Sequence, residues 1–149
     1  AQEERLARMN ACEAAIASLS LSQAQMAAHG PDWTAQYQEV AGRTAQDYRK
    51  RIDLLDDGHA SNPSPQAQTD TPDLVHQRRT RFVLELETRL QCLKVERATY
   101  YALRQAHRIN DELLRNLVSE LDLSEVSLHK RLAVARRAAA RASGNATQT

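Results

Sequence analysis

The chain has 149 residues, of which 42% are hydrophobic and 4% aromatic, and its formal net charge is +1. This length fits one domain, and the near-zero net charge gives no overall field that favours binding to nucleic acid. No apolar run approaches the ~18 residues that a membrane span needs, and no signal-peptide pattern is present. With only four Gly and four Pro, a chain dominated by Ala, Leu, Arg, Gln and Glu has the composition of long helices.

Two helices are predicted in the first part, over residues 2–28 and 31–57. Apolar residues recur three and four positions apart along each, which places them on one helix face. Gly30 and Pro31 separate the helices, since Gly tolerates a positive φ and Pro suits the first helical position. So short a joint predicts an antiparallel hairpin over residues 1–57. The two stripes are Met9, Cys12, Ile16, Leu19, Gln23 and Met26, then Trp33, Tyr37, Val40, Thr44, Tyr48, Ile52 and Leu55.

A linker and a second helical part follow. Residues 58–71 contain two prolines and no apolar residue larger than Ala, so they predict a flexible linker. Residues 72–142 are expected to form one long helix over 72–107 and then a helix–corner–helix, with residues 143–149 as a disordered tail. The stripe of the long helix comprises Val75, Phe82, Leu86, Leu90, Leu93, Tyr100 and Leu103, and Arg79 and Arg97 interrupt it.

The helix–corner–helix carries two helix-start signals. Asn110 can cap the first helix because its side-chain oxygen accepts from unpaired backbone N–H groups, and the two acidic residues after it favour the helix dipole. Ser124 repeats the capping signal. We therefore expect helices over 110–121 and 124–142, with a turn near Asp122 and Leu123.

The first of these helices contains a distinctive order of residues: Ile109, Asn110, Asp111, Glu112, Leu113, Leu114, Arg115, Leu117, Glu120, Leu121, Asp122 and Leu123. That order resembles the soluble C-terminal region of bacterial sodium/proton antiporters of the monovalent cation:proton antiporter-1 type. Residues 97–104 and 48–55 resemble neighbouring helices of the same region more loosely. Where such tails tend to carry Gly before the Ile, this chain has His107–Arg108, which puts a glycine-type helix end in question.

The resemblance implies a non-catalytic cytoplasmic domain that regulates a membrane sodium (or potassium)/proton antiporter. Its expected partners are a second copy in a homodimer and the transmembrane transport domain of the same protein, encoded upstream of Ala1. Its expected place is the cytoplasmic side of the bacterial inner membrane. A free-standing helical adaptor or coiled-coil scaffold, unrelated to transport, is the alternative.

Charge is unevenly distributed along the chain. Residues 1–72 carry six basic and ten acidic side chains, a balance of −4, and residues 73–149 carry fourteen and nine, a balance of +5. Opposite signs predict that the two halves lie against each other, or that one faces an acidic surface; solvated helix faces are the alternative. Two basic groups are candidates for contact with a partner or with anionic lipid: Arg78, Arg79 and Arg81, and Lys130, Arg131, Arg136 and Arg137.

No arrangement of residues predicts catalysis, a metal or another cofactor. The five histidines have no metal-ligand spacing, and neither a phosphate loop nor a nucleophile motif is present. His107, at the corner, is a candidate pH sensor because histidine titrates near neutrality; an exposed or helix-capping role is the alternative. Cys12 and Cys92 lie far apart, which predicts reduced, buried thiols. An all-helical enzyme with catalytic residues from separate turns is the third functional class left open.

These observations together predict an all-α fold of long antiparallel helical hairpins in an elongated, coiled-coil-like bundle. The low aromatic content favours a narrow seam of aliphatic side chains over a wide core. The third helix is on the order of 50 Å long at ~1.5 Å per residue. Two shorter helices cannot cover its whole seam, so we expect a dimer.

Overall fold

The computed structural model describes residues 2–26, 30–57 and 72–146, which form four helices. None of these residues is in a strand, so the predicted all-α fold is confirmed. The predicted linker over 58–71 and the last three residues of the predicted tail lie outside the described residues. The helices are α1 (Gln2–Met26), α2 (Pro31–Asp57), α3 (Pro72–Gln105) and α4 (Asp111–Ala146).

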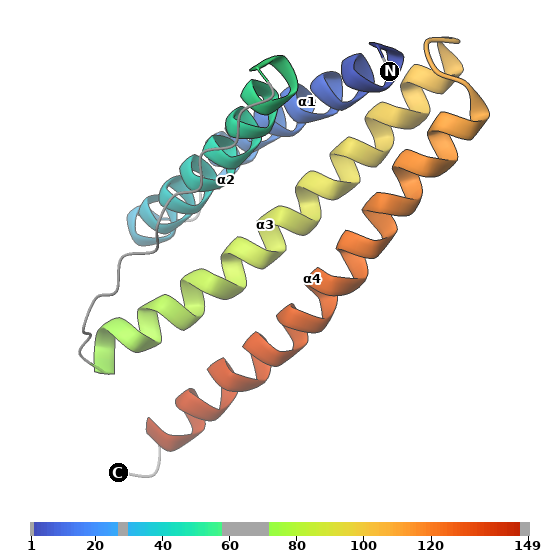
Figure 1. Cartoon of the computed structure of the whole chain (residues 1–149). Coiled ribbons are helices and arrows are strands. Elements are labelled where there is room, and N and C mark those ends of the chain that lie inside the picture. The colour runs from blue at the N-terminus through green and yellow to red at the C-terminus, as the bar shows by residue number, and fades with distance from the viewer. Residues whose placement is uncertain (1, 27–29, 58–71, 147–149) are drawn as a thin grey trace.

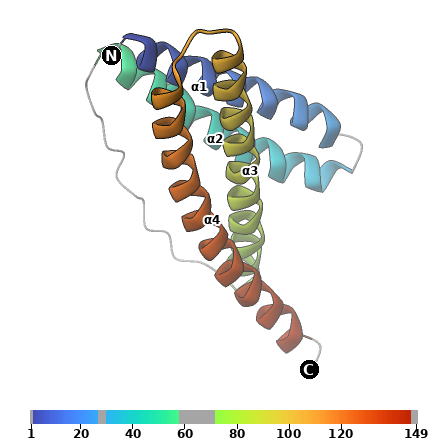
Figure 2. The same ribbon diagram turned by 90° about the vertical axis from the view of Figure 1, so that its right-hand side faces the viewer.

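Helix α3 is the centre of the arrangement. The antiparallel α1/α2 hairpin packs on one side of it, and α4 runs antiparallel to it on another (Figure 1). Helices α2 and α3 run parallel, because ion pairs join their successive turns in the same order. Figure 2 shows α1 and α2 crossing α3 obliquely and the end of α4 extending beyond them. We call residues 77–86 of α3 and 126–141 of α4 the free end of the α3/α4 hairpin.

The core consists of three clusters of buried side chains rather than one. The first joins α1, α2 and α3 around Tyr48, and the second joins α1, α3 and α4 around Tyr100 and Leu117. The third joins only α3 and α4 and lies at and next to the free end. It consists of Leu86, Leu90, Leu132 and Ala135.

Two large residues that the periodicity places on the apolar stripes are not in this core. Trp33 is 50% exposed and Phe82 is 40% exposed. Trp33 lies in the first turn of α2, and Phe82 lies at the free end, where it lines a groove with α4 instead of joining the core cluster that α3 forms with α1 and α2. Periodicity predicts which face of a helix is apolar, but not how far along that face a neighbouring helix extends.

The corner between α3 and α4 follows local backbone rules. Helix α3 ends in a Schellman motif, in which the N–H of Arg108 donates to the carbonyl of Leu103 at 2.9 Å and the N–H of His107 to that of Arg104 at 3.0 Å. His107 has a φ of 56°, so the helix end is of the glycine type although it carries a histidine. Asn110 then caps α4, as predicted, by accepting from the N–H three residues on at 2.8 Å.

The predicted turn near Asp122 and Leu123 is wrong. Helix α4 is continuous over Asp111–Ala146, so Ser124 lies in the middle of a helix. Ser is a good cap in isolation, but it is also tolerated inside a helix at a cost of only a few tenths of a kcal/mol. The helix also includes the first four residues of the predicted disordered tail, 143–149, which corrects that prediction in part.

Tertiary contacts explain why α4 does not break. Leu121 and Leu132 are buried on α3, one on each side of the expected turn. Arg97 of α3 also pairs with Asp122 at 2.6 Å and with Glu125 at 2.5 Å. A turn there would remove both ion pairs and rotate the second half of the apolar seam away from α3, so packing overrides the local capping signal.

Candidate functional site

A groove opens at the free end of the α3/α4 hairpin. It has a volume of about 440 Å³, an apolar floor and basic side chains at its rim. The two basic groups that the sequence presents as contact candidates therefore each contribute to one surface, although they lie far apart along the chain. We call this feature the basic groove. Its lining residues are Arg79 and Phe82 of α3 and Lys130, Arg131, Val134, Ala135 and Ala138 of α4.

The described residues do not neutralise the charge of the basic groove. Across the described ranges, no carboxylate forms an ion pair with Arg79, Lys130 or Arg131, and none lines the groove. The guanidinium of Arg131 lies over the ring of Phe82, 5.7 Å from its centroid, a cation–π contact that fixes the rim against the floor. The groove thus combines exposed apolar surface with unpaired positive charge.

The other basic candidates lie outside the groove. Arg81 pairs with Glu39 at 3.0 Å and Arg136 with Glu87 at 2.8 Å, so both help to hold helices together. Arg78 is exposed but also interacts within the chain, and Arg137 is exposed on α4. Of the seven candidates, three therefore converge on one surface.

Helix α4 carries a second apolar stripe on its outer side. Leu123 is 74% exposed, Val126 54% and Val134 66%. At 3.6 residues per turn, these three lie on the side of α4 opposite the buried seam of Leu121 and Leu132. The outer stripe continues into the basic groove through Val134.

The family-like segment, residues 109–123, mainly builds the fold. Ile109, Leu117 and Leu121 are buried in the second core cluster, with Leu113 and Leu114 partly buried against it, whereas Leu123 is exposed. Its acidic residues form ion pairs to other helices or lie in solvent: Asp111 pairs with Arg104, Glu120 with Arg8 at 2.8 Å and Asp122 with Arg97 at 2.6 Å, and Glu112 is exposed. The segment therefore anchors α4 to α1 and α3.

His107 is exposed at the corner and adopts the left-handed backbone conformation there. The structure thus gives it a place in the helix end, and its role as a pH sensor stays a prediction.

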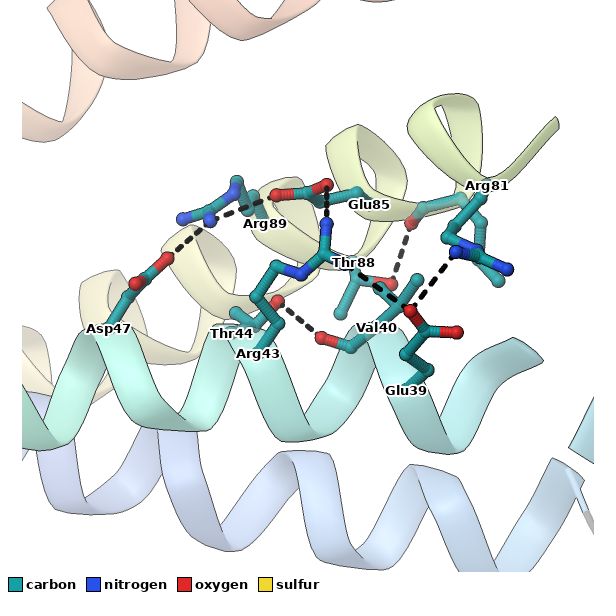
Figure 3. A network of polar contacts seen from close by, with 10 residues as sticks. Glu39, Val40, Arg43, Thr44, Asp47, Arg81, Glu85, Thr88 and Arg89 are labelled. Atoms are coloured by element: carbon teal, nitrogen blue, oxygen red, sulfur yellow. Dashed lines mark hydrogen bonds and ion pairs between the residues drawn. The ribbon is translucent and has the colours of Figure 1, made fainter. Parts of the chain in front are cut away.

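Helix α2 is fastened to α3 by a ladder of ion pairs, and Figure 3 shows the part of it that involves Arg81, Glu85 and Arg89 of α3. Successive turns of α2 carry Glu39, Arg43, Asp47 and Arg51, and the facing turns of α3 carry Arg81, Glu85, Arg89 and Glu96. Because the sign alternates along both helices, a slip of one turn would bring like charges together. Exposed pairs each contribute roughly 0–1 kcal/mol, so the ladder sets register more than stability. Acidic α2 against basic α3 agrees with the opposite charges of the two halves.

The ladder ends at a carboxylate in the core. Glu96 is 0% exposed, and its Oε1 lies 3.2 Å from Nη2 of Arg51, whose side chain is 46% exposed. Neither oxygen of Glu96 accepts a well-aligned hydrogen bond from the described residues. Burial raises the pKa of Glu96 above its ordinary value, and the positive charge of Arg51 opposes that rise. The two side chains therefore differ in exposure: the Glu96 carboxylate has no contact with solvent, whereas the Arg51 side chain is partly exposed to it.

Uncharged side chains, among them Cys12, Cys92 and Tyr100, also lie near this carboxylate. Cys12 and Cys92 are free and buried, which confirms the predicted burial of both thiols. Burial raises the pKa of the Cys92 thiol to about 11 and that of Tyr100 to about 12. Neither thiol is therefore activated as a nucleophile.

Sequence reasoning missed Glu96, although one signal for it exists. Glu96 lies four residues after Cys92 and four before Tyr100, so a carboxylate occupies a position on the buried stripe of α3. The apolar stripe read from the sequence instead places its polar interruption at the neighbouring residue, Arg97. The partner, Arg51, belongs to another helix and only the tertiary structure reveals it.

No family model, no curated protein and no solved structure matches this chain. In the part of the chain that the structure describes, no group of three or more His, Cys, Asp or Glu side chains is placed to hold a metal ion. The same described helices include none with the length and apolar content to cross a membrane.

Proposed function

We propose that this chain is a non-catalytic cytoplasmic regulatory and dimerisation domain of a membrane sodium (or potassium)/proton antiporter. It modulates exchange that an upstream transmembrane domain carries out. The resemblance of residues 109–123 to antiporter C-terminal regions supports the antiporter assignment. A regulatory rather than a catalytic role is supported by the basic groove, where Phe82 and Val134 stay exposed beside cations that form no ion pair with a carboxylate of the described residues. Large apolar patches on a folded domain mark contact surfaces.

The dimer forms through the α1/α2 hairpin. Leu21 at the end of α1 is 65% exposed and Trp33 at the start of α2 is 50% exposed, and large apolar and aromatic side chains of this kind are enriched at homodimer interfaces. Sedimentation of the whole chain tests this. Leu21→Ser with Trp33→Ser should shift the dimer toward monomer, whereas Leu123→Ser, at a more exposed residue on α4, should leave it unchanged. A monomeric wild-type chain would remove dimerisation from the proposal.

The antiporter assignment is tested through the reading frame and through transport. We expect the frame to continue upstream of Ala1 with about a dozen apolar runs of membrane-spanning length. In everted membrane vesicles, removal of residues 1–149 from that protein should leave sodium- or potassium-dependent proton movement present but change its dependence on pH or ion concentration. An initiator Met directly before Ala1 would contradict the assignment.

A free-standing helical adaptor or scaffold is the second candidate, because the outer stripe of α4 would serve a protein partner equally well. The two are separated by the same transport assay. An adaptor unrelated to transport would leave every transport parameter of the host membrane unaltered on deletion.

A further inference from the structure

The basic groove differs from the rest of the charged surface in combining an open apolar floor with cations that lack carboxylate partners among the described residues. Elsewhere, arginines such as Arg8, Arg89 and Arg97 bridge helices through ion pairs. Arg79, Lys130 and Arg131, which line the basic groove, form no such ion pair with the described residues. Beneath them, Phe82 and Val134 keep 40% and 66% of their surface exposed. A partner for this surface must supply negative charge at the rim and apolar groups for the floor.

The cations extend along α4 beyond the groove. From Val126 to Arg141 the sequence has five basic residues and no acidic one. At 3.6 residues per turn, Val126, Lys130, Val134, Arg137 and Arg141 fall within an arc of roughly 80° on the outer side of α4. That side carries apolar and basic side chains together, so apolar contacts and positive charge face the same direction and suit an anionic lipid surface.

We propose that the free end of the α3/α4 hairpin docks on an anionic phospholipid surface. Phe82 and Val134 enter the boundary between headgroups and acyl chains, and Arg79, Lys130 and Arg131 bind lipid phosphates. The inference rests on the proposed function for its location beside a membrane, and it deepens that function by naming the surface that meets the lipid. The α1/α2 hairpin, on the other side of α3, is left for the second copy.

Charge opposes a symmetric contact in which a second copy presents the same basic groove. Two such surfaces facing each other would bring Lys130 and Arg131 of one copy against the same cations of the other, with no acidic residue lining either groove. A nucleic acid would satisfy the cations but would leave the apolar floor uncovered. An anionic lipid satisfies both, because its phosphate and its acyl chain belong to one molecule.

The test measures binding of the whole chain to large vesicles by flotation. Vesicles of phosphatidylglycerol and phosphatidylcholine at 3:1 are compared with vesicles of phosphatidylcholine alone, at 50 and 300 mM salt. We expect binding to the anionic vesicles only, weaker at the higher salt concentration. Each neutralised cation at the surface should lower the partition coefficient about fivefold, so Arg79→Gln/Lys130→Gln/Arg131→Gln should lower it on the order of 100-fold.

A matched control removes the same charge from elsewhere. Arg49→Gln/Lys50→Gln/Arg115→Gln changes three exposed cations outside the groove and should lower binding by less than about tenfold. Val134→Ser keeps every charge and should still lower binding severalfold, which a purely electrostatic attraction would not. Helical circular dichroism of each variant checks that it is folded.

Three results would overturn the inference: no binding to anionic vesicles, equal losses in the groove and control variants, or complete displacement by 10 mM inorganic phosphate or by an acidic peptide. The last would indicate a site for free anions or for an acidic protein segment. Failure of the proposed function is a separate observation, because vesicle binding needs only this chain, whereas regulation of exchange is measured in the transport assay.

Discussion

Replacement of Arg51 by Met should destabilise the fold strongly, because it leaves the buried carboxylate of Glu96 without its cation. Breaking a buried ion pair costs roughly 3–5 kcal/mol when a charge stays behind in the core. Arg51 is 46% exposed, so water already screens part of the attraction and the lower figure applies. We expect a loss of about 3 kcal/mol in the free energy of unfolding at pH 8. The reverse change, Glu96→Gln, leaves a cation that can turn to solvent and should alter stability by less than about 1 kcal/mol.

The sign of the pH dependence follows from the raised pKa of Glu96. Between the unfolded-state pKa, near the ordinary 4.5, and the higher folded-state pKa, the folded chain binds more protons than the unfolded chain. The stability that Glu96 contributes through its raised pKa is therefore greatest below pH 4.5 and is lost as the pH rises through the folded-state pKa. Loss of Arg51 raises that pKa further, so the penalty of Arg51→Met should shrink as the pH falls from 8 to 5.

Urea unfolding followed by circular dichroism at 222 nm, at pH 5 and pH 8, measures these differences. The double variant Arg51→Met/Glu96→Gln should recover about 2 kcal/mol of the loss at pH 8, since the charge is gone. Arg43→Met, which removes a cation that is 50% exposed and pairs with Glu39 and Glu85, is the control and should cost under about 1 kcal/mol. If Arg51→Met cost no more than Arg43→Met, or the same at both pH values, the carboxylate would not be held as a charge in the core.

Three further predictions concern the corner, the core and the thiols. Asn110→Ala should cost about 1 kcal/mol of stability by removing the cap of α4. His107→Gly should raise stability by roughly 0.5–1 kcal/mol, because glycine adopts the left-handed conformation without strain. If neither substitution changed stability, the corner would fray in solution. Leu117→Ala, at a residue 1% exposed, should lower the free energy of unfolding by about 3 kcal/mol. Leu123→Ala should change it by no more than about 0.5 kcal/mol. Equal losses would mean that both faces of α4 are covered. Cys92, whose pKa burial raises to about 11, should react with a thiol reagent at pH 8 only after urea unfolds the chain, and fast labelling of the native protein would contradict the buried position.

Local chemistry was enough to predict the helices and most of their ends. Asn110 and the pair Gly30–Pro31 mark boundaries because caps and backbone conformation depend on a few adjacent residues. The apolar stripes likewise predict which face of each helix is buried, since helical period is a property of the backbone. Ser124 is the exception, because a cap signal of about 1 kcal/mol competes with the packing of a whole helix on α3.

The tertiary structure decided what the charged residues do. Arg79 and Arg131 meet in the basic groove, and Arg51 meets Glu96 in the core, although each pair is far apart along the chain. Arg81 and Arg136, from the same basic groups, are instead used in ion pairs between helices. A charged side chain has no preferred partner until the helices pack, because its interaction depends on distance and on exposure to water, and both are properties of the assembled fold.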